Sequence, residues 1–123
     1  MKKIYHLGTC STCQAILKET GIQSLADKGK FELQDIKTEK ISPAQLDEMK
    51  ALSGSYESLF SRRALKYKSM GLKDKQLTEK DYRKLILEEY TFLKRPVALV
   101  NGKIFTGNDK KTVEALKAAV SKG

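Results

Sequence analysis

The order of three segments at the start of the chain constrains its fold most. A short β-prone run over residues 3–7 ends at Gly8, and a helical pattern follows that stops at Gly21. Residues 31–36 then alternate apolar and polar side chains, as a half-buried strand does. Because the connection has the length of a helix, the two strands are expected to run parallel with a right-handed crossover.

The middle of the chain reads as helical. Ser42-Pro43 is a typical helix start, residues 56–60 predict a second short helix, and Thr78 opens a capping box before a third. Six basic residues lie between residues 62 and 75. We therefore expect a helical insertion over about residues 41–93.

The end of the chain predicts a hairpin and a helix. Asn101-Gly102 joins two β-prone runs, residues 97–100 and 103–106, and is a strong hairpin signal. Apolar residues at helical spacing from Val113 onward predict a last amphipathic helix. The whole predicts an α/β fold with a mixed sheet of about four strands and a helical insertion between the second and third strands. With no repeat or linker-like tract, residues 1–123 are expected to form one domain.

The composition limits where in the cell the protein is expected and which partners it is expected to bind. The chain is 40% hydrophobic and 32% charged, without an apolar run that could span a bilayer or serve as a signal peptide, so we expect a cytoplasmic protein without a membrane partner. The formal charge of +9 suggests an anionic substrate or partner, or a lysine-rich solvated surface. Direct nucleic-acid binding is not expected, because acidic residues are mixed with the basic ones and aromatic residues do not alternate with them.

Cys10 and Cys13 carry the chemistry. Cys10 is expected at the start of the first helix, where free N–H groups and the helix dipole favour a thiolate. Ser11 and Thr12 can add hydroxyl donors around it. Cys13 lies one turn later on the same face, and either resolves an intermediate as a disulfide or is a small buried apolar residue. A structural zinc site is not expected, because His6 is the one further soft ligand.

Three arginines are candidates for anion binding. Arg95 and Pro96 precede the third predicted strand, where Arg95 either clamps an anion beside Cys10 or is a surface residue. Arg62 and Arg63 are a second anion contact or a solvated helix face, and composition alone favours the solvated face. His6 is interpreted as a packed or surface residue of the first strand.

Three motifs resemble a known family. Residues 5–13 (Tyr-His-Leu-Gly-Thr-Cys-Ser-Thr-Cys), residues 59–63 (Leu-Phe-Ser-Arg-Arg) and residues 95–97 (Arg-Pro-Val) are similar to the family of glutaredoxin-linked arsenate reductases and Spx-type regulators. The similarity runs from Ile4 to about Leu116, with the motifs in the right order and spacing. It is closest to the short, reductase-like bacterial members.

The resemblance implies a thioredoxin-like fold, with Pro96 as a cis proline beside the active cysteine. It implies that Cys10 is the nucleophile that attacks arsenate and that Arg63 and Arg95 bind the oxyanion, whereas Arg62 stays ambiguous. Ser11, Thr12, Arg62 and Pro96 are expected to line the substrate site. No cofactor is expected to be bound, and glutathione with glutaredoxin, or thioredoxin, would supply electrons.

The chain departs from the reductases in two ways. Residues 106–109 lack the third arginine that usually follows the last strand, and Cys13 resembles instead the redox switch of Spx-type regulators. The leading hypothesis is a thiol-dependent, arsenate-reductase-like oxidoreductase acting on a small oxyanion, as a monomer. The alternatives are a redox-sensing transcriptional regulator that binds the RNA polymerase α subunit, and a general thiol-disulfide reductase.

Overall fold

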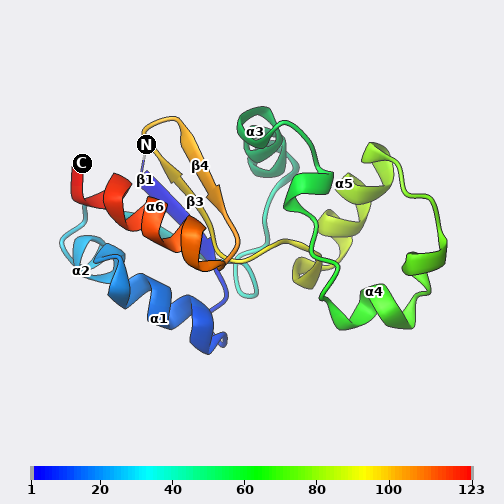
Figure 1. The fold of residues 1–123 in the computed structure, drawn as a ribbon, viewed down its shortest axis with the longest axis horizontal. Helices are drawn as coiled ribbons and strands as arrows, with labels where there is room; N and C mark the ends of the chain where they lie inside the picture. The colour runs from blue at the N-terminus through cyan, green and yellow to red at the C-terminus, as the bar shows by residue number, and fades with distance from the viewer. Residues whose placement is uncertain (1, 123) are drawn as a thin grey trace. The chain divides into compact units, whose positions relative to one another are not determined.

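The computed structural model describes residues 2–122, which form two compact units. Unit 1 comprises the chain up to Lys40 and again from Arg95, and unit 2 comprises Ile41–Lys94. The chain therefore leaves unit 1 once, builds unit 2, and returns. Figure 1 shows the elements of each unit.

Unit 1 is built on a mixed sheet of four strands in the order β2-β1-β3-β4. Its strands are β1 (Lys2–His6), β2 (Glu32–Asp35), β3 (Val97–Val100) and β4 (Lys103–Thr106). β1 pairs with β2 in parallel and with β3 antiparallel, and β3 forms a hairpin with β4. The helices of this unit are α1 (Ser11–Glu19), α2 (Ile22–Asp27) and α6 (Lys110–Lys122).

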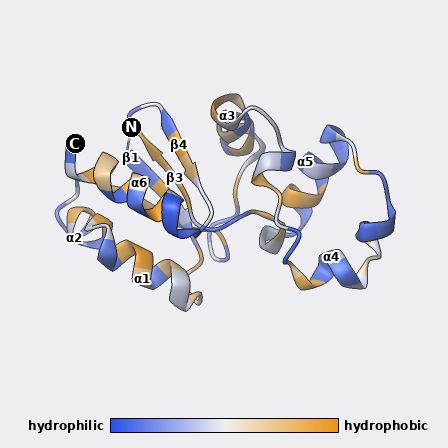
Figure 2. Cartoon of the chain, in the orientation of Figure 1, coloured by the Kyte–Doolittle hydropathy of each residue, from blue (hydrophilic) through white to orange (hydrophobic). Residues whose placement is uncertain are grey.

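One hydrophobic core joins the sheet of unit 1 to its helices. It contains residues of β1, β3 and all three helices: Ile4, Ile16, Leu17, Ile22, Phe31, Ala98, Val100, Val113, Leu116 and Val120. In Figure 1, α1 and α6 lie side by side along the sheet, and Figure 2 shows hydrophobic and hydrophilic residues alternating along both. This spacing buries one stripe of each helix.

Unit 2 is helical throughout. Its elements are α3 (Pro43–Ser53), η1 (Glu57–Leu59), α4 (Leu65–Ser69), η2 (Leu72–Asp74), α5 (Glu79–Glu88) and η3 (Tyr90–Phe92). Capping boxes at Ser42 and Thr78 begin α3 and α5. The sequence predicts the box at Thr78, and at Ser42 it predicts a helix cap followed by Pro43. The carboxylate of Glu79 also accepts the N–H groups of Tyr56 and Glu57 at 2.8 and 3.0 Å, which ties η1 to α5.

Aromatic rings hold the centre of unit 2. Phe60 stacks on Phe92 with ring centroids 5.0 Å apart and contacts the ring of Tyr82 at 4.9 Å. Next to this cluster, the backbone of Ser61 donates to the carbonyl of Phe92 at 2.7 Å. Residues 92–94, which lead back to unit 1, are therefore hydrogen-bonded to the end of η1 and the residues that follow it.

The predicted α/β fold, with its four-stranded mixed sheet and helical insertion between the second and third strands, is confirmed. α2 was not predicted, because Gly21 was interpreted as the end of the helical region. Gly21 does adopt a left-handed conformation, at φ 81°, but the chain turns there directly into another helix. No helix within residues 2–122 is long and apolar enough to cross a membrane.

Candidate active site

Cys10 lies where the sequence predicts it, at the N-cap of α1, after a tight turn that follows β1. The turn is closed by a hydrogen bond from the Cys10 N–H to the Leu7 carbonyl at 3.0 Å. The Cys10 carbonyl then accepts the Gln14 N–H at 3.1 Å, the first bond of the helix. These two bonds fix the backbone on either side of the sulfur, which is partly exposed.

The surroundings of Cys10 favour its thiolate. Burial opposes the charge, but hydrogen bonding from the Cys13 N–H and thiol and from the Thr12 N–H, together with the charge of Arg95, lowers the pKa of Cys10 below its ordinary value. The N–H groups of the first turn are therefore available to a negative charge on the sulfur.

Cys13 has the opposite character. It is buried, with 1% of its surface exposed, on the core side of α1. Burial, and next to it the negative charge and hydrogen bond of Cys10, raise the pKa of Cys13 to about 11. Both cysteines are free thiols, and at neutral pH the Cys13 S–H donates toward the Cys10 sulfur. The pair thus divides into a reactive thiol and a protonated one.

Arg95 reaches the same site from the start of β3. Its Nη1 atom is buried and has no hydrogen-bond partner in the described part of the chain, and the charge of Arg95 lowers the pKa of both cysteines. A buried guanidinium N–H without an acceptor is costly unless an anion completes it. The peptide bond between Arg95 and Pro96 is cis, as expected, and the Pro96 carbonyl accepts the Gly107 N–H at 2.9 Å.

Asp35 is a neighbour of this loop that sequence reasoning missed. In the parallel pairing of β1 and β2 it lies opposite His6, and a Cβ atom built on Gly8 would clash with its carboxylate Oδ2. Its Oδ1 accepts the Lys37 N–H at 3.0 Å, which holds the carboxylate in place. Gly8, two residues before Cys10, was the signal in the sequence that could have indicated this contact. A side chain can approach the backbone this closely only where the residue is glycine.

His6 is buried beside Asp35, with 8% of its surface exposed and its Nδ1 atom without a partner. Burial lowers the pKa of His6, and the charge of Asp35 acts in the opposite direction. The imidazole is therefore neutral at pH 7. The interpretation of His6 as a packed strand residue agrees with this burial.

The other predicted site residues differ in their contacts. Ser11 and Thr12 are exposed in the first turn of α1, and Pro96 is buried. Arg62 and Arg63 belong to unit 2, in the turn before α4. Arg62 donates to Glu57 at 2.7 Å and to the Tyr82 hydroxyl at 3.1 Å, whereas the Arg63 side chain has no hydrogen bond or ion pair with residues 2–122.

The residues of unit 1 can stabilise a thiolate and an anion beside it. Within the part of the chain that the structure describes, no group of three His, Cys, Asp or Glu side chains is arranged to hold a metal ion. The groups that stabilise negative charge on Cys10 are the guanidinium of Arg95 and the backbone N–H groups of Thr12 and Cys13.

Comparisons with known proteins give a consistent result. The model of one protein family, the ArsC family, matches residues 5–116. A structure titled arsenate reductase from Vibrio cholerae is 20% identical, with a TM-score of 0.72, over 94% of this chain and 96% of that one. A structure titled possible arsenate reductase from Streptococcus mutans is 27% identical, with a TM-score of 0.69, over 94% and 97%.

An NMR structure of the Staphylococcus aureus protein SACOL0876 is 24% identical, with a TM-score of 0.67, over 94% of this chain and 97% of that one. No curated protein sequence matches the chain significantly. The structural likenesses show the same fold, a thioredoxin-like sheet with a helical insertion.

Proposed function

The chain belongs to the ArsC family, and from this premise we propose that it is a thiol-dependent oxidoreductase of the arsenate reductase type. Cys10 is its nucleophile and a small oxyanion is its substrate. The observation that carries the proposal is the buried Nη1 atom of Arg95, which has no acceptor among residues 2–122, together with the charge of Arg95 acting on Cys10. A guanidinium in this position suits an oxyanion, whose oxygens accept its hydrogen bonds.

In the proposed reaction the Cys10 thiolate attacks the arsenic of arsenate. A sulfur–arsenic bond forms, an arsenic–oxygen bond breaks, and the oxygen leaves as hydroxide that takes up a proton to become water. Arg95 and the N–H groups of α1 bind the remaining oxygens. A second thiol then attacks the Cys10 sulfur, a disulfide forms, and arsenic departs with the electron pair as arsenite.

Glutathione or Cys13 supplies the second thiol. The structure supports Cys13 as a candidate, because its thiol is hydrogen-bonded to Cys10. Its high pKa, about 11, keeps it protonated until the Cys10 charge is consumed by bond formation. Glutaredoxin or thioredoxin would then reduce the resulting disulfide.

An arsenate turnover assay with glutathione and glutaredoxin tests the proposal. We expect arsenite from the natural chain, none from Cys10→Ser, and a loss of at least tenfold in kcat/KM from Arg95→Ala. Arg63→Ala is expected to raise KM, and Arg62→Ala is the matched control, because Arg62 is already paired with Glu57. Absence of arsenite from the natural chain would contradict the proposal.

The same assay assigns the second thiol. Continued turnover by Cys13→Ser would identify glutathione, and arrest after the first adduct would identify Cys13. If the chain reduces a model disulfide but not arsenate, it is a general thiol-disulfide reductase.

The hydrogen-bonded thiol pair also favours one alternative, a redox-sensing regulator of the Spx type. Such a protein would bind the C-terminal domain of the RNA polymerase α subunit differently in its reduced and oxidised states. A pull-down of that domain with both states tests this, and failure to bind in either state would rule the regulator out.

A further inference from the structure

α4 is a helix of unit 2 that buries none of its own residues. The ring of Tyr67 meets Phe60 edge-on at 5.9 Å, and Lys66 pairs with Glu89 at 2.8 Å. Leu65 begins the helix and is 89% exposed, and Met70 follows its end at 46% exposed. Two large apolar side chains are therefore presented to solvent on a short, anchored helix.

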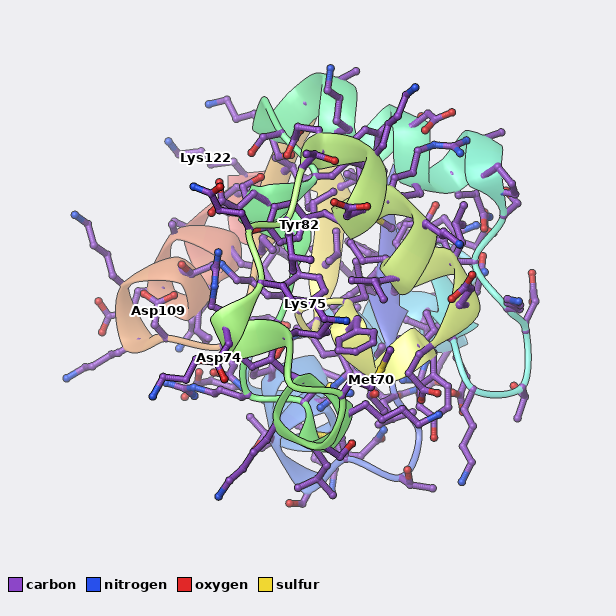
Figure 3. All side chains as sticks on the ribbon, turned by 90° about the vertical axis from the view of Figure 1, so that its right-hand side faces the viewer. Met70, Asp74, Lys75, Tyr82, Asp109 and Lys122 are labelled. Atoms are coloured by element: carbon purple, nitrogen blue, oxygen red, sulfur yellow. The ribbon has the colours of Figure 1, made fainter. Side chains whose placement is uncertain are left out.

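Basic residues flank these two side chains along the sequence. Between residues 62 and 75 the chain has six basic residues and a single acidic one, Asp74. Arg62 and Lys66 are paired with Glu57 and Glu89. The remaining cations make no hydrogen bond or ion pair with residues 2–122, and they are Arg63, Lys68, Lys73 and Lys75. Figure 3 looks onto this segment and labels Met70, Asp74 and Lys75 along it.

We propose that these residues form a docking surface for an acidic segment of a partner protein, one that places an apolar side chain among its carboxylates. We call Leu65, Met70 and the four unpaired cations the α4 surface. Carboxylates of the partner complement the cations and speed the encounter, and the apolar side chain buries Leu65 and Met70 at the centre of the contact.

The composition of the α4 surface distinguishes this partner from two others. Single-stranded nucleic acid needs aromatic side chains for base stacking, and Tyr67, the one aromatic residue between 62 and 75, is packed on Phe60. A membrane surface needs an amphipathic helix with a broad apolar face, whereas α4 has five residues. An acidic protein segment with an apolar side chain can contact both the unpaired cations and the exposed side chains of Leu65 and Met70.

Fluorescence anisotropy with four probes tests the proposal on the full chain. The probes are a labelled peptide of Glu-Glu-Leu repeats, a polyglutamate peptide of equal charge, a DNA duplex, and phosphatidylglycerol vesicles. We expect the Glu-Glu-Leu peptide to bind most tightly and to weaken as salt is raised. Leu65→Ser with Met70→Ser should reduce its affinity about tenfold, to that of polyglutamate.

Matched variants control for charge and exposure. Lys68→Glu, Lys73→Glu and Lys75→Glu together should abolish binding, whereas Lys18→Glu, Lys28→Glu and Lys117→Glu, an equal change of charge in unit 1, should weaken it only slightly. Leu52→Ser, at an exposed apolar residue of α3, should have no effect. Circular dichroism verifies that each variant is folded. Equal loss in both lysine sets, or tighter binding of DNA or vesicles, would overturn the proposal.

Discussion

At the scale of single residues, the candidate site is defined by the contrast between two thiols on one turn of helix. Cys10 is partly exposed with a pKa below its ordinary value, and Cys13 is buried with a pKa of about 11. The contrast arises from position: the first residue of the turn meets free N–H groups, and the fourth faces the core. A thiol pair of this kind reacts in a fixed order.

Replacing Cys13 tests how much its thiol lowers the pKa of Cys10. Cys13→Ala removes a hydrogen-bond donor from the Cys10 sulfur, so the pKa of Cys10 should rise toward its ordinary value. Alkylation of Cys10 by iodoacetamide at pH 7 should then slow several-fold, and its pH profile should move to higher pH. Cys13→Ser, which keeps a donor, is the control, and equal rates in the two variants would show that the donor is unimportant.

Gly8 provides a second test at this scale. In Gly8→Ala the new methyl group displaces the Asp35 carboxylate from the Lys37 N–H, so unfolding should become easier by about 1 kcal/mol. Denaturant titration measures this change. Because Asp35→Ala removes the same contact, adding Gly8→Ala to Asp35→Ala should cost little more, whereas adding it to Asp27→Ala, at a residue exposed on α2, should cost the full amount. Additive effects of the Gly8 and Asp35 changes would contradict the contact.

At the scale of elements, local signals in the sequence were sufficient wherever a few adjacent residues determine the structure. The capping boxes at Ser42 and Thr78 and the Asn101-Gly102 turn are such cases, and the structure has each of them. The contact of Asp35 with Gly8 was not predicted, because it depends on strand register between residues far apart in sequence. Cys10 and Arg95 were predicted from their neighbours, but the unpartnered Nη1 of Arg95 requires coordinates.

The packing of α6 on the sheet is tested by truncating one core residue. Leu116 is 2% exposed in the core of unit 1, so Leu116→Ala should lower the free energy of unfolding by about 3 kcal/mol. Lys117→Ala, at the neighbouring exposed position, should change it by less than about 0.5 kcal/mol. Urea denaturation of both variants gives the comparison, and a small effect at Leu116 would show that α6 is loosely packed.

α3 and α5 are joined by one carboxylate, which predicts a pH dependence. Asp47 accepts Arg83 Nε at 2.9 Å and the Tyr56 hydroxyl at 2.6 Å, and these bonds lower its pKa to about 2. In the unfolded chain the pKa of Asp47 is about 4. The bonds of the Asp47 carboxylate therefore stabilise the folded state fully above that pH, and this stabilisation is lost as the pH falls toward 2. The melting temperatures of the natural chain and Asp47→Asn should therefore differ at pH 6 and converge near pH 2.

At the scale of the whole molecule, the chain passes between its two units twice, at Lys40–Ile41 and at Lys94–Arg95. Unit 2 is thus an insertion within unit 1, whose sheet is completed only after the chain returns as β3. Each unit has its own packed residues, the sheet core in unit 1 and the aromatic cluster around Phe60 in unit 2. The sequence predicts that residues 1–123 form one domain, and this stays a prediction.

We expect a single unfolding transition for the full chain. The exposure of Cys13 to a thiol reagent reports on unit 1, and NMR signals of Phe60 and Phe92 report on unit 2. The two probes should give the same urea midpoint if the chain is one cooperative domain. Separate midpoints would instead identify the units as two domains that fold independently.

The burial of His6 has a practical consequence. The chain has one histidine, so the Hε1 and Hδ2 ring-proton resonances of its imidazole can be assigned without ambiguity to the end of β1, opposite Asp35. The chemical shifts of these protons therefore report on the conformation of the loop between His6 and Cys10, without selective isotope labelling or an attached dye. Oxidation, anion binding or alkylation at the thiol can each be followed through these shifts in one titration.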